Sequence, residues 1–233
     1  MKMTSLLTLI LGFGSVVSAA GLKLHPTIYY IQTIDAEKDC AAKKNILDEK
    51  GNVLFKVCKD NYKTCVIEGT CAVVDEPSTP ATDDNVTLIN YLKQDKTGKF
   101  LFKEINTDRC PYGLGVSNIC LDPFYSVAAD LEFNKPGEVI FVPKLKGLQL
   151  PNGEVHSGFL IVRDKGGAIK GSNRFDFYTG FLHYKDQKNP FTGLGFADSD
   201  SDIEYRKATP KEAEEFKKTR NYPLIPESTE AKD

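Results

Sequence analysis

Residues 163–180, RDKGGAIKGSNRFDFYTG, contain the pattern around which we expect the fold to be organised. Two acids, Asp164 and Asp176, bracket a glycine-rich turn, and apolar runs precede and follow it. Glycine permits positive φ and close backbone approach, so this pattern predicts a strand, a glycine turn and a second strand. Such an arrangement can hold two carboxylates near each other at the rim of a sheet. The alternative from spacing alone is a surface hairpin with two solvated acids.

The amino-acid sequence of this stretch resembles the Asp-Thr-Gly-Gly-Ala-Ile-Lys-Gly…Asp signature of the 3D domain, which is named for three aspartates. The same signature occurs in the membrane-bound lytic transglycosylase A family. Upstream, AADLEFNKPG at 128–137 resembles the family's Ala-Val-Asp-Pro…Gly stretch and supplies the third aspartate, Asp130. The resemblance covers roughly residues 63–181. Short strands between turns indicate only an all-β barrel or sandwich, and the resemblance narrows this to a six-stranded double-psi β-barrel.

The resemblance also implies an enzyme, a peptidoglycan lytic transglycosylase. Cleaving a glycosidic bond requires protonation of the leaving oxygen and stabilisation of positive charge at the sugar C1. Asp176 matches the family's acid, which then acts as base toward the sugar's own 6-hydroxyl, so that a 1,6-anhydro sugar forms without water. One acid suffices because the nucleophile is tethered to the substrate. Asp164 and Asp130 match the supporting pair; alternatively, one or both tie down barrel loops by accepting backbone N–H bonds.

Several other residues are candidates for contact with the glycan. A lysine can also be merely solvated, and a tyrosine can pack in the core instead. The sequence departs from the family in three ways: Lys165 replaces a threonine, the interval between the last two aspartates is one residue longer, and the family's large second domain has no room. We expect residues 21–109 to form a smaller wall. The candidates are Glu68, Tyr112, Gly166, Gly167, Lys170 and Tyr178.

Composition and the N-terminus point to an exported protein. The chain has 233 residues and a formal net charge of -2, which argues against binding nucleic acid through bulk charge. Lys2, an apolar run at 6–17 and small residues at 18–20 predict a signal peptide. No later apolar run reaches the length of a membrane span. We expect a secreted or periplasmic monomer that binds peptidoglycan glycan strands without stable membrane insertion.

Cysteine usage agrees with export. An even number of cysteines beyond the signal peptide favours disulfides, and the sequence leaves their pairing open apart from a plausible local pair around PYGLG. No metal or other cofactor is expected, because Cys-x-x-Cys spacing is lacking and DSDSD at 198–202 fails the EF-hand pattern. Asn85 begins a glycosylation sequon. The six cysteines are Cys40, Cys58, Cys65, Cys71, Cys110 and Cys120.

Strand and turn signals divide the chain into four parts. Apolar and β-branched runs predict strands at 22–34, 53–58, 65–74, 87–92 and 99–105, then in SVAAD, EVIFV, FLIVR and FDFYT. The segments 53–58 and 65–74 are expected to form a hairpin, and a loose Glu-x-Thr match at 66–70 suggests the first barrel strand. Thr209-Pro210-Lys211-Glu212 predicts a capped helix. The expected parts are a signal peptide at 1–19, a β extension contributing the first barrel strand at 20–85, the barrel at 86–205, and a helix and tail at 206–233.

Two alternatives to the enzyme remain open at this point. A non-catalytic, expansin-like module would share the barrel and bind cell-wall carbohydrate. A disulfide-stabilised secreted interaction protein would use the acids only structurally.

Overall fold

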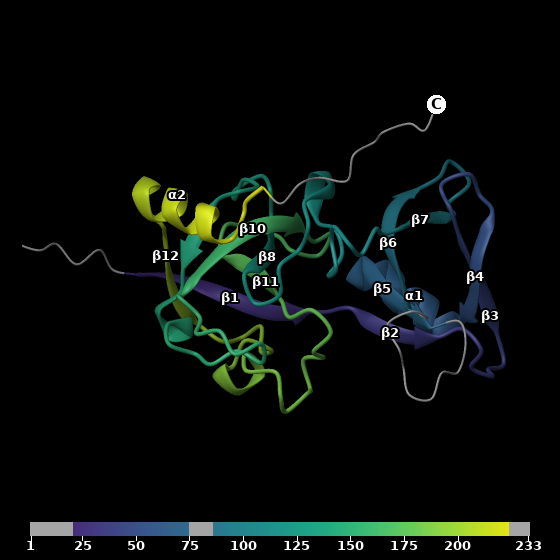
Figure 1. Ribbon diagram of the computed structural model, residues 1–233, viewed down its shortest axis with the longest axis horizontal. Helices are drawn as coiled ribbons and strands as arrows, with labels where there is room; N and C mark the ends of the chain where they lie inside the picture. Colours follow the sequence, from purple (N-terminus) through teal and green to yellow (C-terminus); the bar gives the residue numbers. More distant parts are fainter. Residues whose placement is uncertain (1–20, 75–85, 224–233) are drawn as a thin grey trace, which may run out of the picture.

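The protein consists of two β units, and the chain passes from one to the other twice (Figure 1). The computed structural model describes residues 21–74 and 86–223. The predicted signal peptide and the sequon at Asn85 lie outside the described residues. Among those described, no helix is both long and apolar enough to cross a membrane.

The first unit is a closed six-stranded barrel with the strand order β1-β11-β8-β10-β9-β12. Two of its pairings, β1 with β11 and β8 with β10, are parallel. The prediction of a closed all-β barrel is therefore confirmed. Its strands are β1 (Leu22–Tyr29), β8 (Ser126–Ala129), β9 (Val139–Phe141), β10 (Phe159–Lys165), β11 (Arg174–Tyr178) and β12 (Ile203–Lys207).

The second unit is an open six-stranded sheet with the order β2-β5-β6-β7-β3-β4. It draws on residues 32–104, so the strands divide differently from the sequence-based boundary at residue 86: β6 and β7 join this sheet and not the barrel. The first barrel strand is β1, not the segment at 66–70. The sheet strands are β2 (Gln32–Asp35), β3 (Lys43–Leu47), β4 (Val53–Cys58), β5 (Thr70–Val74), β6 (Val86–Gln94) and β7 (Phe100–Glu104).

The predicted hairpin of 53–58 with 65–74 is wrong, because the helix α1 (Lys59–Glu68) separates β4 from β5. Gly69 ends the helix with a φ of +81°, and its N–H bonds to the carbonyl of Cys65. The Cys65–Cys71 disulfide then closes this reversal, with Cys65 fully buried against the sheet. The β-branched residues of 59–68 favour a strand only weakly. In the helix, Cys65 is the residue that is buried against the sheet.

The other two disulfides fix loops of the second unit and of the junction. Cys40 pairs with Cys58, and Cys110 pairs with Cys120, as the local spacing around PYGLG suggested. All six cysteines are therefore bonded, which agrees with the prediction of an exported, oxidised protein.

Alternation along β1 separates two faces of the barrel wall. Leu24 and Ile28 point into the barrel core, whereas Tyr29 and Ile31 belong to a second apolar cluster between the barrel and the second unit. The predicted strand at 22–34 is therefore two strands, which serve different sheets. Neighbouring residues of a strand point to opposite faces, so Ile28 lies in the barrel core and Tyr29 in the second cluster.

The glycine-rich stretch does not form a hairpin. Its flanking strands β10 and β11 are both hydrogen-bonded to β8, which lies between them. The four expected strands from SVAAD to FDFYT are all present as β8 to β11. The chain therefore crosses β8 between β10 and β11. These two strands follow each other in the sequence, but they pair with opposite edges of β8.

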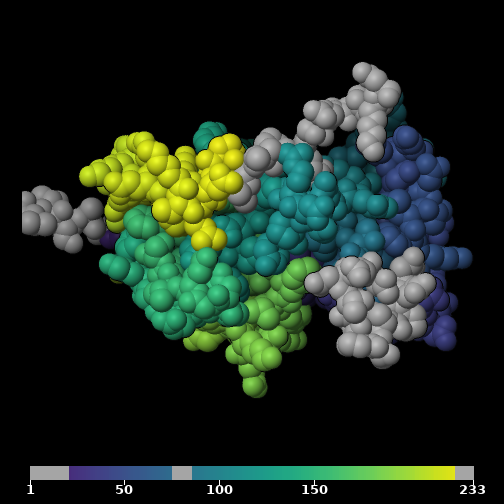
Figure 2. Space-filling model, in the orientation of Figure 1, coloured from purple at the N-terminus to yellow at the C-terminus, as the bar shows by residue number. Residues whose placement is uncertain are grey.

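The C-terminal helix closes one side of the barrel. Helix α2 (Pro210–Thr219) begins at the predicted capping box, in which the Thr209 side chain and Glu212 each accept from the other's backbone N–H. Phe216 packs into the barrel core, and Figure 2 shows α2, in yellow, lying on the barrel surface. The sequence signals missed strand β12, in which buried Ile203 and Tyr205 alternate with more exposed residues.

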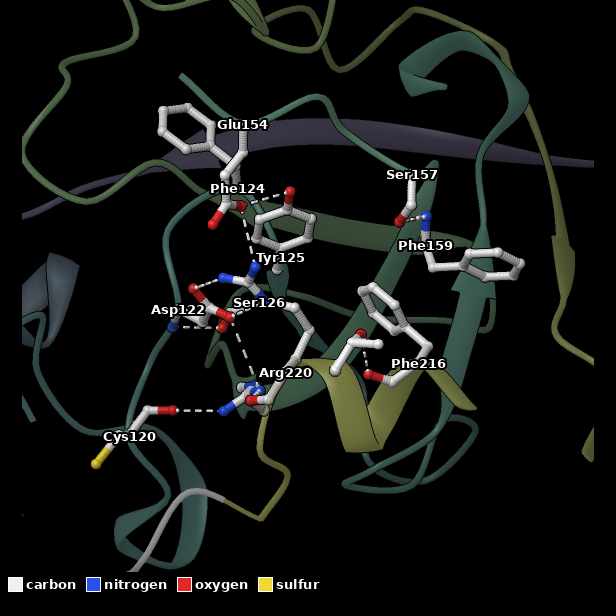
Figure 3. A network of polar contacts seen from close by, with 12 residues as sticks. Cys120, Asp122, Phe124, Tyr125, Ser126, Glu154, Ser157, Phe159, Phe216 and Arg220 are labelled. Atoms are coloured by element: carbon white, nitrogen blue, oxygen red, sulfur yellow. Dashed lines mark hydrogen bonds and ion pairs between the residues drawn. The ribbon is translucent and has the colours of Figure 1, made fainter. Parts of the chain in front are cut away.

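A polar network fastens the end of α2 to the barrel (Figure 3). Arg220 donates to both carboxylate oxygens of Asp122 at 2.8 Å, and to Glu154 Oε2 at 3.0 Å. Its guanidinium lies over the ring of Tyr125, 3.8 Å from the centroid. A shallow hollow of about 460 Å³ adjoins this network, lined in part by Tyr125, Glu154 and Phe216.

Candidate functional site

Two of the three predicted acids face each other across one strand. Asp176 on β11 and Asp164 on β10 are register partners of the same residue, Ala128 on β8. Residues paired in register project from the same face of a sheet. The two acids therefore flank a small alanine on the outer face of the barrel, with their backbones about 10 Å apart, or two strand spacings.

A β-bulge gives Asp164 this orientation. The register between β10 and β8 shifts between Val162 and Asp164, so that Arg163 is the extra residue. A bulge re-aims the side chains that follow it. Arg163 is fully buried and donates to the carbonyl of Cys120 at 3.0 Å, while Asp164 faces the same side as Ala128. Without this extra residue, Asp164 would pair with Ala129, whose side chain belongs to the barrel core.

Two tyrosines form the next layer of the same face. Tyr29 on β1 is the register partner of Tyr178 on β11, with ring centroids 4.9 Å apart. The Tyr29 hydroxyl donates to Asp164 Oδ2 at 3.3 Å, and the Tyr178 hydroxyl donates to the carbonyl of Tyr112. Both tyrosines are buried, and burial raises the pKa of each phenol well above its usual value. They therefore remain neutral donors next to the acids.

Burial also raises the pKa of both carboxyls. For Asp164 it reaches about 7, because burial and the Asp176 charge outweigh the N–H of Lys165 and the hydroxyl of Tyr29. For Asp176 the pKa is raised to about 6 by burial, against the Thr27 hydroxyl and the Arg174 guanidinium. A carboxyl that stays protonated near neutral pH can act as a general acid.

One oxygen of Asp176 lacks a protein partner. Asp176 Oδ1 is buried without a hydrogen bond among the described residues, and so is Oγ1 of Thr27, its register partner on β1. Buried polar atoms of a folded protein are nearly always hydrogen-bonded, so such a pair needs an explanation. The two groups are register partners, and the Thr27 hydroxyl lies close enough to lower the pKa of Asp176, so each is the nearest polar neighbour of the other.

Glu68 adds a third acid with a raised pKa. It lies at the end of α1 and accepts from the backbone N–H of Tyr30 at 3.3 Å. Burial raises its pKa to about 7, and the charge of Asp176 contributes in the same direction. The second unit therefore contributes one carboxyl to the surroundings of the barrel acids.

Asp130 has different surroundings from the other two aspartates. Its carboxylate accepts from the N–H groups of Gly171, at 2.9 Å, and Glu132, at 3.2 Å. These hydrogen bonds and the charge of Lys170 lower its pKa, so the group is ionised. The contacts are those of a loop anchor, which holds the glycine-rich segment against the end of β8.

The remaining predicted contact residues lie on the loops around this face. Lys170 is exposed, and Gly167 has open space around it, whereas a side chain at Gly166 would collide with Ile169 at 2.3 Å. Tyr112 is 39% exposed and lies edge-on to Phe181, which is 46% exposed. No motif in the sequence points to Thr27, Tyr29 or Phe181 as residues near this site. In a predicted strand at 22–34, residues 27 and 29 must lie on the same face. The sequence does not show, however, that this strand pairs with β11.

The raised pKa values of Asp164 and Asp176 predict that the free energy of unfolding falls as the pH rises. A folded-state pKa above the unfolded value of about 4 stabilises the fold at low pH, and this contribution is lost as pH rises through about 6 and 7. The double variant Asp164→Asn, Asp176→Asn should therefore gain stability over the wild type between pH 4 and pH 8. We expect about 1 kcal/mol for each carboxyl, after allowance for their partial exposure.

Calorimetric melting across that pH range measures this difference. The matched control is Asp130→Asn, for which the difference from the wild type should stay nearly constant over this range, because the contribution of a lowered pKa is lost only as pH falls below the unfolded value of about 4. A constant difference between wild type and double variant across the range would contradict the assigned burial of the acids.

Comparisons with known proteins agree with the geometry. The family model of the 3D domain matches residues 125–189, and no curated protein matches the sequence significantly. The structure is similar to that of Escherichia coli MltA with bound chitohexaose, at 14% identity and a TM-score of 0.51, over 81% of this chain and 73% of that one. A membrane-bound lytic murein transglycosylase from Agrobacterium tumefaciens aligns over 82% of this chain and 75% of its own, at 14% identity and a TM-score of 0.49.

At this level of identity, the likeness to the Escherichia coli protein shows a shared fold. The segment matched by the family model is more specific, since it runs from β8 to β11 and contains Asp130, Asp164 and Asp176. Residues 125–189 therefore match the 3D domain, and they lie in a structure whose fold resembles that of the lytic transglycosylase MltA.

Proposed function

We propose that this protein is a peptidoglycan lytic transglycosylase, which cleaves the bond between N-acetylmuramic acid and N-acetylglucosamine. The observation that carries the proposal is the placement of Asp164 and Asp176 on either side of Ala128, where burial raises the pKa of both carboxyls. The fold shared with MltA, a structure of which contains chitohexaose, supports a glycan substrate.

The proposed reaction uses Asp176 twice. Its protonated carboxyl gives a proton to the glycosidic oxygen as the bond from that oxygen to C1 breaks. The ionised carboxylate then takes the proton of the sugar's 6-hydroxyl while that oxygen bonds to C1. The product is a 1,6-anhydro sugar, no water is consumed, and Asp176 ends protonated as it began. Raised pKa values near neutrality allow both roles.

Asp164 has a complementary role in this scheme. In its ionised form it stabilises the positive charge that develops at C1 in the oxocarbenium-like transition state. Asp164 lies about two strand spacings from the acid, on the other side of Ala128. Asp130 holds the loop that carries Gly171, and Glu68 and Lys170 provide further polar contacts with substrate.

Digestion of purified peptidoglycan followed by mass spectrometry tests the proposal. Anhydro-muropeptides are the expected product. Reducing ends would indicate a hydrolase instead, and the absence of released fragments together with retained glycan binding would identify an expansin-like binding module.

The exposed aromatic pair beside the site predicts a substrate-binding effect. Tyr112 and Phe181 lie edge to face, with centroids 6.2 Å apart, and Tyr112 is linked to the site through the Tyr178 hydroxyl. Replacing both with alanine should raise KM about tenfold, or about 1.4 kcal/mol, with kcat little changed, because a sugar face loses its stacking surface. Val53→Ala, at an exposed apolar position on the second sheet, is the control and should leave KM unaltered. Equal KM values in both variants would exclude the aromatic pair from substrate binding.

A further inference from the structure

Glu68 brings a carboxyl of the second unit toward the barrel acids. It is the last residue of α1, and Gly69 turns the chain directly after it with a φ of +81°. The Cys65–Cys71 disulfide spans this turn, and the N–H of Tyr91 on β6 donates to the carbonyl of Gly69 at 2.6 Å. The end of the helix is therefore fixed by two connections to the sheet, and with it the place from which Glu68 projects.

A backbone group beside the barrel holds the Glu68 carboxyl from the other side. The N–H of Tyr30 donates to Glu68 Oε2 at 3.3 Å. Tyr30 lies three residues beyond Thr27, the register partner of Asp176, and three residues of extended chain span about 10 Å. Glu68 is close enough to Asp176 for the charge of that acid to contribute to its raised pKa. A glycan that contacts Asp176 can therefore reach Glu68 with a neighbouring sugar.

The second oxygen of Glu68 is available to a ligand. The side chain is partly exposed, and Oε1 makes no hydrogen bond with a described residue. Burial raises the pKa of the carboxyl to about 7, against the N–H of Tyr30. Because Oε2 accepts that N–H, the proton of the neutral carboxyl belongs on Oε1, from which it can be donated outward. Below about pH 7, Glu68 therefore presents a hydrogen-bond donor and not an anion.

The groups that surround Glu68 combine one acid with aromatic rings. Strand β11 contributes Asp176, and the link between β1 and β2 contributes the Tyr30 phenol, whose pKa is raised by burial and by the charge of Glu68. The Tyr30 ring lies edge-on to His183, which stacks on Tyr184, with centroids 4.5 and 4.3 Å apart. In the described part of the chain, no cation lowers the pKa of Glu68. These surroundings offer a sugar both an apolar surface and a neutral donor.

We propose that Glu68 is a specificity-determining residue, which in its neutral form donates a hydrogen bond from Oε1 to the carbonyl oxygen of a sugar's 2-acetamido group. The inference rests on the proposed function, in which both sugars of the substrate carry this group. An amide oxygen only accepts hydrogen bonds, so it pairs with a neutral carboxyl and is repelled by a carboxylate. Sugar hydroxyls both donate and accept, so they pair with either form of Glu68.

Calorimetric binding of chitohexaose, a hexamer of N-acetylglucosamine, tests this role. Between pH 6 and pH 8, the affinity of the wild type should fall about fivefold relative to Glu68→Gln, because the carboxyl loses its proton while the glutamine amide keeps a donor. Asp164 and Asp176 titrate in the same range but are present in both proteins, so the comparison isolates Glu68. A wild-type affinity that rises relative to Glu68→Gln would show a carboxylate acceptor and overturn the proposal.

Cellohexaose is the matched ligand, because it has the same β-1,4 backbone with a hydroxyl in place of each acetamido group. At pH 6, Glu68→Ala should bind chitohexaose about fivefold more weakly than the wild type and cellohexaose equally well. Glu49→Ala, at an exposed acid between β3 and β4, is the control and should bind both ligands as the wild type does. Equal losses for the two ligands in Glu68→Ala would overturn the proposal, and so would a loss confined to glycans that carry stem peptides.

Failure of this inference is distinguishable from failure of the proposed function. The calorimetric comparison requires no turnover, whereas the proposed function fails if wild-type digests contain no anhydro-muropeptides. Parallel pH profiles of the wild type and Glu68→Gln would reject the role of Glu68 while leaving that product intact.

Discussion

Asp176→Asn should abolish the release of anhydro-muropeptides while leaving the barrel folded and able to bind glycan. Asparagine has almost the same shape as aspartate but cannot deliver a proton to the glycosidic oxygen. General acid catalysis contributes on the order of a hundredfold to ten-thousandfold to rate, and this is the expected loss in kcat. Mass spectrometry of digested peptidoglycan measures the product, and sedimentation with insoluble peptidoglycan measures binding.

Asp130→Asn is the informative comparison for that experiment. Its carboxylate accepts two backbone N–H groups, of which an asparagine oxygen can retain one. We expect a less than tenfold loss in kcat, together with a lower melting temperature, since the loop is loosened but the reacting groups remain. If Asp130→Asn were as inactive as Asp176→Asn while folded, all three aspartates would belong to the catalytic machinery, as the family resemblance implies.

Arg163→Met should produce the largest loss of stability among single substitutions near the site. The guanidinium is fully buried, donates to the carbonyls of Cys120 at 3.0 Å and Arg220 at 3.3 Å, and lies 3.9 Å from Asp122. Methionine fills much of the same space but removes the Arg163 donors from two carbonyls and leaves a carboxylate with one cation fewer. We expect a loss of about 3 kcal/mol in the free energy of unfolding.

Chemical denaturation measures this loss, and Arg206→Met is the control. Arg206 makes a bidentate contact with Glu212, at 2.7 and 2.6 Å, but both side chains are partly exposed, so its loss should be about 1 kcal/mol or less. Activity of Arg163→Met should also fall, because the bulge at Arg163 sets the direction of Asp164. Equal losses of stability in the two variants would show that the buried guanidinium contributes no more than a surface ion pair.

The positions of most strands followed from local pattern. Apolar runs bounded by glycine, proline and asparagine predicted β8 to β11 and β6 to β7, and a capping box predicted the start of α2. These signals are local, since propensity, turn chemistry and capping act within a few residues. One segment was predicted wrongly: α1 includes β-branched residues, and it ends at Gly69, where the chain reverses and the Cys65–Cys71 disulfide spans the turn.

The sequence by itself determined which acids to examine, since the spacing of Asp164 and Asp176 around glycines is a property of one short stretch. Only the tertiary structure decided that these acids lie on opposite sides of β8, that a bulge at Arg163 turns Asp164 outward, and that Tyr29 reaches it. Strand order, bulges and cross-strand partners depend on pairing between residues far apart in the chain, and no local preference encodes that pairing.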